Sequence, residues 1–172
     1  MKPGDEDEFR EFVSARLDAL RRTAYLLCRD WHTADDLVSI TVGRIYRNWR
    51  RVRAADNVDA YVRGMLTHAW LDERRRPWRR EHVSEELPDR SDPASPEPSL
   101  ADREVLWDLL GRLAPRRRAV VVLRFYCDLS VEQTAEILGI STGTVKSQAA
   151  RALEHLRLLA TEEMTMEYGR RV

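Results

Sequence analysis

The sequence predicts an all-α protein made of two small helical domains joined by a flexible acidic linker. Only 7 Gly and 7 Pro occur in 172 residues. Several of the prolines stand close together, so long stretches are free of helix breakers. Apolar residues recur along those stretches at three-and-four spacing, which is the period of an amphipathic helix. A hydrophobic content of 43% is enough to build compact cores.

We expect the first domain to span residues 6–80 and to contain three helices. An apolar stripe at helical spacing predicts the first helix over about residues 6–29. Thr33 followed by Asp36 resembles a capping box and predicts the start of the second helix. Asn57 has the side chain of a helix N-cap and predicts the start of the third.

Charge is segregated along the chain although the formal net charge is zero. Residues 44–80 contain 11 Arg and 4 acids, a local charge of +7. Residues 81–102 contain 7 acids and a single Arg, a local charge of −6. Residues 81–99 also hold four prolines among serines and acids, so they cannot bury apolar surface and are expected to form the linker. A basic surface and an acidic linker segment are therefore expected in one chain of zero net charge.

The second domain is expected over residues 100–160. Pro115 suits the first turn of a helix that continues through residue 126. Ser130 and Gln133 form an S-x-x-Q capping box, which predicts the start of a further helix. Ser141 is expected to cap the last helix of the domain.

The segment Val131–Leu153 predicts a helix-turn-helix. Ala135 is small where two helices must approach closely, and Gly139 fits a left-handed turn between them. Val145 and Leu138 would fill the small core beneath the turn. An ordinary helical hairpin with a polar outer face is the alternative. In the helix-turn-helix packing, the second helix presents to solvent side chains that suit the DNA major groove: Lys146, Ser147, Gln148, Ala150 and Arg151.

At this point a family resemblance becomes plain. Residues 129–157, LSVEQTAEILGISTGTVKSQAARALEHLR, resemble the promoter −35 recognition region, region 4, of sigma factors of the extracytoplasmic function (ECF) type. Residues 113–128, LAPRRRAVVVLRFYCD, resemble the segment that leads into it. In the first domain, residues 34–49, ADDLVSITVGRIYRNW, resemble the polymerase-clamp-binding helix of region 2. Residues 60–76, AYVRGMLTHAWLDERRR, resemble the −10 recognition and melting helix. The resemblance is closest to the actinobacterial SigE-like group of the sigma-70 family.

The resemblance implies that the chain binds core RNA polymerase, at the clamp of the β′ subunit and the flap of β, and directs it to promoter DNA. The clamp-binding residues would be Asp35, Asp36, Leu37, Ser39, Ile40, Arg44 and Arg47. The residues that contact the −10 element would be Arg63, Thr67, His68, Trp70, Arg74, Arg75 and Arg76. The residues that contact the −35 element would be Thr142, Thr144, Lys146, Ser147, Gln148, Ala150 and Arg151.

Two aromatic residues leave alternatives open, and the recognition helix departs from its family. Trp70 or Trp78 could stack on an unpaired base, and core packing is the alternative for both. Many relatives carry Arg at the position of Gln148 and bulky residues at Ala149 and Ala150. Direct readout of bases at the −35 element is therefore expected to be weaker, with more reliance on DNA shape.

Other function classes fit the sequence less well. A regulator that binds operator DNA without polymerase would need only the helix-turn-helix. Against an interaction module, such as an anti-sigma or scaffold protein, stands the absence from the sequence of the zinc-binding Cys/His cluster or kinase-like motifs typical of anti-sigma proteins, besides the resemblance to sigma factors themselves. We expect no enzyme activity, no cofactor and no metal, because four scattered histidines and no phosphate-cradling Gly loop offer no catalytic site.

The remaining expectations concern location and partners. Cys28 and Cys127 lie in apolar stretches and are expected to be buried free thiols in a reducing cytosol. No apolar run is long enough to cross a membrane, so a cytoplasmic protein without membrane insertion is expected. The free chain is expected to be a monomer, and the resemblance implies an anti-sigma protein as a further partner.

Overall fold

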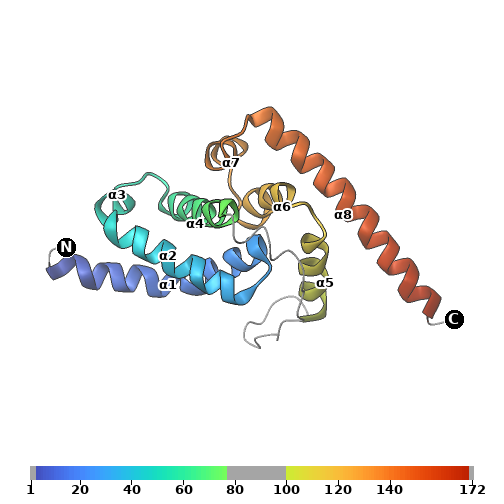
Figure 1. Cartoon of the computed structure of the whole chain (residues 1–172), viewed down its shortest axis with the longest axis horizontal. Coiled ribbons are helices and arrows are strands. Elements are labelled where there is room, and N and C mark those ends of the chain that lie inside the picture. Colours follow the sequence, from blue (N-terminus) through green and yellow to red (C-terminus); the bar gives the residue numbers. More distant parts are fainter. Residues whose placement is uncertain (1–2, 77–99, 171–172) are drawn as a thin grey trace. The chain divides into compact units, whose positions relative to one another are not determined.

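The chain folds into two compact helical units that divide between residues 90 and 91 (Figure 1). The computed structural model describes residues 3–76 and 100–170, and all the regular structure in these two ranges is helical. The predicted fold class is therefore confirmed. The predicted linker at residues 81–99 and Trp78 lie outside the described residues.

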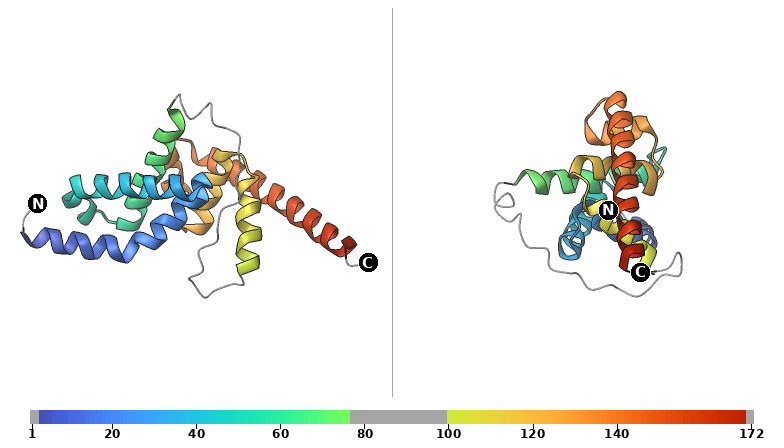
Figure 2. Two further views of the ribbon diagram at one scale, coloured as in Figure 1. Left: turned by 60° about the horizontal axis from the view of Figure 1, so that its bottom comes forward. Right: turned by 90° about the vertical axis from the view of Figure 1, so that its right-hand side faces the viewer.

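The first unit contains the helices α1 (Pro3–Cys28), α2 (Trp31–Arg47), α3 (Trp49–Arg53) and α4 (Val58–Arg75). The helix α2 turns back along α1, and α4 packs against both, as Figures 1 and 2 show. The short helix α3 contacts α2 and α4. The three long helices correspond to the three that the apolar periodicity predicts.

The core of this unit lies where the three long helices meet. Leu27 of α1, Leu37 of α2 and Leu66 of α4 are fully buried. Burial of one such side chain stabilises a fold by about 1.5–3 kcal/mol. At the other end of α1, Phe12 packs edge-to-face on buried Trp49, with ring centroids 5.2 Å apart. Apolar contacts of this kind, rather than charge, hold the helices together.

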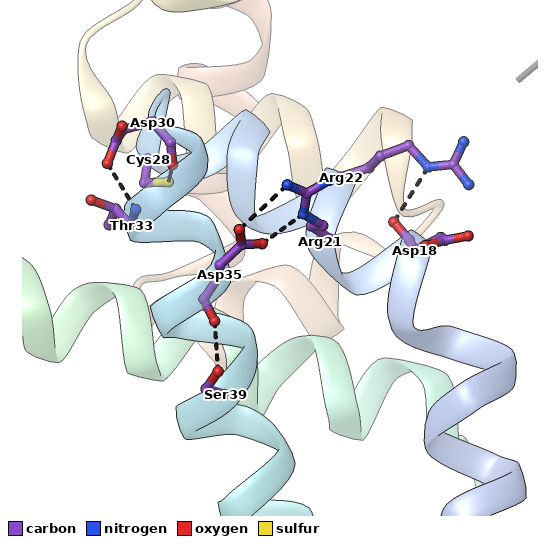
Figure 3. A network of polar contacts seen from close by, with 8 residues as sticks. All are labelled: Asp18, Arg21, Arg22, Cys28, Asp30, Thr33, Asp35 and Ser39. Carbon is purple, nitrogen blue, oxygen red and sulfur yellow. Dashed lines mark hydrogen bonds and ion pairs between the residues drawn. The ribbon is translucent and has the colours of Figure 1, made fainter. Parts of the chain in front are cut away.

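The junction between α1 and α2 corrects the predicted cap of α2 (Figure 3). The helix begins at Trp31, and the carboxylate of Asp30 accepts a 2.8 Å hydrogen bond from the backbone N–H of Thr33. Thr33 is thus the third helical residue and not the cap. The chain enters this turn through Arg29, whose φ of 65° is left-handed. Asn57, in contrast, caps α4 as predicted, accepting from the backbone N–H of Ala60 at 2.9 Å.

The two cysteines differ in burial. Both thiols are free, and Cys127 is buried as predicted. Cys28 is only half-buried, which corrects the prediction for this residue. It is the last residue of α1, and its thiol donates a hydrogen bond to the backbone carbonyl of Asp30 at 3.2 Å.

The second unit contains the helices α5 (Leu100–Gly111), α6 (Pro115–Val121), α7 (Val131–Leu138) and α8 (Thr142–Arg170). The helix α8 packs against α5, α6 and α7. Pro115 begins α6 as predicted, but the helix does not continue as a regular α-helix. The five residues that follow it, Val122–Tyr126, form a π-helical turn, η2.

The last helix ends later than the predicted domain. We expected the domain to end at residue 160, whereas α8 continues to Arg170. Figures 1 and 2 show the last turns of α8 extending beyond α6 and α7. Among the described residues, none of the helices has the length and apolar content that a membrane crossing requires.

The turn between α7 and α8 generates a first prediction. Gly139 has a φ of +64°, and a Cβ built there would meet no atom within 4 Å. The cost of Gly139→Ala therefore comes from the left-handed backbone, and we expect it to lower the free energy of unfolding by about 1–2 kcal/mol. Gly143→Ala is the matched control, because Gly143 is helical and its Cβ would only approach Ser141 Oγ at 3.9 Å. It should raise stability by up to about 1 kcal/mol. Urea denaturation measures both, and equal effects would contradict this account.

The cap of α2 generates a second prediction, which depends on pH. Partial burial raises the pKa of the Asp30 carboxyl, but hydrogen bonds from Thr33 and the charge of His32 outweigh it and hold the pKa below its ordinary value. The carboxylate therefore stabilises the fold above the ordinary pKa of Asp, and this contribution is lost as the pH falls through the lowered pKa.

We expect Asp30→Ala to cost about 1 kcal/mol of unfolding free energy at pH 7. The loss should begin to shrink below about pH 4, where the carboxyl of the unfolded chain takes up its proton, and should vanish below the lowered pKa of the folded state. Asp30→Asn is the control, because the amide oxygen still accepts from the Thr33 N–H but does not titrate. Urea denaturation at pH 7 and pH 3 measures both variants. A loss of unfolding free energy in Asp30→Ala that is equal at the two pH values would contradict this explanation.

Candidate nucleic-acid interface

The helix-turn-helix predicted from residue 131 onward is present in the second unit. Ser130 caps α7, and the capping box is complete: its hydroxyl accepts from the Gln133 N–H at 3.0 Å, and the Gln133 side chain accepts from the Ser130 N–H at 2.9 Å. Gly139 ends α7 in the left-handed conformation, and its N–H donates to the carbonyl groups of Ala135 and Glu136. Each of these local predictions is confirmed.

A small apolar cluster fixes the two helices against each other. Ala135 of α7, Val145 of α8 and Val120 of α6 are buried together. Leu138 packs against the cluster and is partly buried, so it lies beneath the turn as predicted. Because Val145 is fully buried, the rotation of α8 about its own axis is set, and the residues that α8 turns outward follow from it.

The outer face of α8 carries the predicted DNA-contacting side chains. Ser141 accepts from the Thr144 N–H at 3.1 Å and caps the helix as predicted. Lys146 and Arg151 are exposed, and neither has a hydrogen bond or ion pair among the described residues. Both cations are therefore free to approach an anion. Thr142, Ser147 and Ala150 are exposed as well, whereas Thr144 and Gln148 are half-buried.

One residue of this surface was not predicted from the sequence. Arg117 of α6 donates from Nε to Oε1 of Gln148 at 3.2 Å. The two residues are separated by 31 positions. No local pattern indicates such a contact, because it depends on how α6 and α8 cross. Arg117 therefore belongs to the surface that surrounds the recognition helix.

The structure corrects two of the predicted −10-contacting residues on α4. Thr67 is fully buried, and its hydroxyl donates to the Arg63 carbonyl at 2.8 Å. Trp70 is 3% exposed, so core packing is the correct interpretation of this side chain. Both residues point into the helix packing and offer no atom to an outside strand. The guanidinium of Arg74 lies over the Trp70 ring, 5.2 Å from its centroid.

Other predicted residues of α4 lie at the surface. His68 and Arg75 are exposed and seven residues apart, which places them two turns apart on one face of the helix. Arg76 is exposed and pairs with Glu73 at 3.2 Å. Arg63 is half-buried and lines an open groove of about 330 Å³ between α1 and α4, beside the ion pair of Arg16 with Asp59. The exposed set is basic, as the local charge predicts.

Three of the predicted clamp-binding residues of α2 point toward other parts of the first unit. Asp35 faces α1, where its carboxylate accepts from Arg21 Nε at 2.6 Å and from Nη2 at 3.3 Å (Figure 3). Arg44 faces α4 and donates to Asp72 at 2.8 Å. Leu37 is fully buried, so the prediction that it contacts a partner is corrected.

The remaining four residues of this set form an outward stripe on α2. Asp36, Ser39 and Arg47 are exposed and Ile40 is half-buried. The spacing of Asp36, Ile40 and Arg47 places them on one face of the helix. Asp36 has no hydrogen bond or ion pair among the described residues. The stripe thus has a free acid at its start and a base at its end.

The described part of each unit holds no arrangement of groups suited to metal binding. Within residues 3–76 and 100–170, no three His, Cys, Asp or Glu side chains stand close enough to hold an ion. What both units present is charged helix surface over an apolar core. Such surfaces suit the binding of macromolecules.

Comparisons with known proteins match both units. The family model "Sigma-70 region 2" matches residues 12–80, and "Sigma-70, region 4" matches residues 103–156. The first match covers α2 and α4 with their charged faces. The second covers the helix-turn-helix and most of α5.

Individual relatives extend the match to most of the chain. The RNA polymerase sigma-E factor of Streptomyces coelicolor is 40% identical over 158 residues, 90% of this chain and 86% of the relative. That of Streptomyces avermitilis is 41% identical over 157 residues, 91% of this chain and 87% of the relative. Among solved structures, the sigma factor RpoE in complex with the anti-sigma factor NepR from Bartonella quintana is similar in fold. It has a TM-score of 0.74 at 24% identity, over 90% of this chain and 97% of that one.

Proposed function

The chain belongs to the sigma-70 family and is an RNA polymerase sigma factor of the ECF type, and on that premise we propose that it binds core RNA polymerase and directs it to specific promoters. The observation that supports this most is the presence of both family regions in one chain. A regulator that binds operator DNA by itself needs only the helix-turn-helix, and it would leave residues 12–80 without a role.

The second unit supplies the −35 contacts. In a helix-turn-helix the second helix enters the major groove and its first turns face the base edges. On α8 those turns carry Lys146 and Arg151 as free cations. They suit phosphate oxygens and the O6 and N7 acceptors of guanine. The small exposed Ala150 lets the helix approach the floor of the groove closely.

The first unit supplies the −10 contacts through the exposed part of α4. Unpaired DNA binds to grooves that combine positive charge with side chains on which a base can stack. Arg75 and its basic neighbours provide the charge. Since Trp70 is buried, His68 is the aromatic side chain of the predicted set that remains at the surface.

The polymerase-binding surface is the outward stripe of α2, formed by Asp36, Ser39, Ile40 and Arg47. It lies on a different helix from the −10 contacts, so one unit can hold polymerase and a DNA strand at the same time. Acid and base at opposite ends of the stripe would orient the helix on a partner of complementary charge. The half-buried Ile40 between them supplies apolar contact.

The remaining roles follow from this assignment. Sigma factors are transcription-initiation factors and not enzymes, so polymerase would carry out all bond formation. The protein would work in the cytoplasm, where polymerase is. A similar fold is bound by an anti-sigma protein in the solved structure of RpoE with NepR. We propose such a partner here too, because a protein that covers the charged helix faces would block both polymerase and DNA.

The polymerase-binding stripe generates a third prediction. Asp36→Asn removes the free acid of the stripe, and we expect it to weaken binding to core polymerase by about 1 kcal/mol, roughly fivefold in Kd. Asp35→Asn is the matched control, because Asp35 is held by Arg21 within the chain. It should leave the Kd nearly unchanged and lower only stability, by less than about 1 kcal/mol. Titration of labelled core enzyme measures the Kd of both variants. A larger rise in Kd for Asp35→Asn than for Asp36→Asn would refute the assignment of the stripe to polymerase binding.

The recognition helix generates a fourth prediction. Arg151→Ala should lower promoter-directed run-off transcription about tenfold, as expected for the loss of one good base or phosphate contact. Binding to core polymerase should stay nearly intact. Arg157→Ala is the control, since Arg157 is an exposed arginine of α8 outside the predicted set. Loss of polymerase binding in Arg151→Ala would contradict the assignment of polymerase binding to α2 and of the −35 contact to α8. If core enzyme gained no start-site selectivity from the wild-type chain, the proposed function itself would be wrong.

A further inference from the structure

The contact between Arg117 and Gln148 restricts what the recognition helix can offer to DNA. Arg117 Nε lies 3.2 Å from Gln148 Oε1, and both side chains are half-buried. A guanidinium has five N–H donors and no acceptor. The Gln148 atom that faces it must therefore be the carbonyl oxygen, and the amide NH₂ points elsewhere. The chemistry of the pair fixes the orientation of an amide that is otherwise free to flip.

An unrestrained glutamine has a different preference. Its amide pairs with adenine through two hydrogen bonds, since Oε1 accepts from N6 and Nε2 donates to N7. In this chain the guanidinium stands beside Oε1. A base that brings its own N–H₂ donor to that oxygen would meet a fixed positive charge. The oxygen keeps a second lone pair, but the charge of the guanidinium opposes the approach of adenine N6–H₂ to it. The pairing with adenine is thereby weakened, and the amide NH₂ remains as a donor.

We propose that Arg117 makes Gln148 act mainly as a hydrogen-bond donor, and thereby as a specificity residue, in the −35 contact. At the base pair that Gln148 faces, it would favour a base with acceptors on its major-groove edge, guanine with O6 and N7 or thymine with O4. It would disfavour adenine and cytosine, which present an N–H₂ group. Arg117 then acts as a positioning residue. This inference rests on the proposed function, because it requires α8 to lie in the major groove of promoter DNA.

The contact is not needed to hold α6 against α8. Val120 of α6 and Val145 of α8 are 1% and 0% exposed and already join the two helices. A single hydrogen bond between half-buried groups adds little to that packing. Arg116, the neighbour of Arg117 on α6, is exposed and has no hydrogen bond or ion pair with α8 among the described residues. Arg116 therefore provides a control of equal charge and equal length.

The test is run-off transcription by the reconstituted holoenzyme on promoters with a randomised −35 element, read by sequencing of the transcribed templates. The variants are Arg117→Met, Arg116→Met and Gln148→Ala, each first checked for an unchanged melting temperature. Wild type should disfavour adenine at one position by about tenfold. Arg117→Met should raise the frequency of adenine at that position among the transcribed templates at least about fivefold, and it should leave the base frequencies at the other positions unchanged. Arg116→Met should keep the wild-type preference, and Gln148→Ala should abolish it.

Three results would overturn the inference. The first is a loss of transcription in Arg117→Met that is equal for all −35 sequences, which would make Arg117 a phosphate contact only. The second is an unchanged preference in Gln148→Ala, which would remove Gln148 from base selection. The third is a wild-type preference for adenine that depends on Gln148. All three presuppose promoter-selective transcription by the wild type. Its absence would instead refute the proposed function, so the two failures are distinguishable.

Discussion

The proposed DNA-binding surface of α8 depends on one small piece of apolar packing, the contact of Ala135, Val145 and Val120 beneath the left-handed turn at Gly139. Only the three residues 139–141 separate α7 from α8, and the small Ala135 lets α8 approach α7. Once Val145 is buried, helical periodicity leaves no freedom in which residues of α8 face solvent. The exposed cations of α8 are thus placed by apolar residues that are themselves buried.

The same relation between core and surface holds in the first unit. Leu37, Thr67 and Trp70 point into the packing of α1, α2 and α4, so the faces that remain are charged. Ion pairs such as Arg21 with Asp35 tie some of these charges to a neighbouring helix. Exposed pairs of this kind contribute only about 0–1 kcal/mol to stability. Their effect here is selective: they occupy one acid of α2 and leave the adjacent Asp36 available to a partner.

These features fit a protein that acts by placing other molecules. Neither unit has a group of metal ligands among its described residues, whereas each presents charged helix surface. A zero net charge is compatible with DNA binding because positive charge is concentrated in residues 44–80. Two weak DNA contacts on one chain gain strength when a third molecule holds them at a fixed separation, since the second contact is then intramolecular. Core polymerase would be that molecule.

The sequence by itself determined the helical class, the caps at Asn57 and Ser130, and the turn at Gly139. These depend on interactions within about four residues and on the period of a single helix, which a sequence displays directly. The start of α2 was mistaken because Asp30 and Thr33 are both capable caps, and the left-handed Arg29 before them decided between the two.

Only the tertiary structure decided that Thr67 and Trp70 are buried, that Asp35 is paired, and that Arg117 meets Gln148. Each of these depends on how one helix crosses another. Arg117 and Gln148 are 31 residues apart, and their contact requires both the crossing of α6 and α8 and the rotation of each helix about its axis. Packing between distant segments sets these quantities, and no local pattern of residues encodes them.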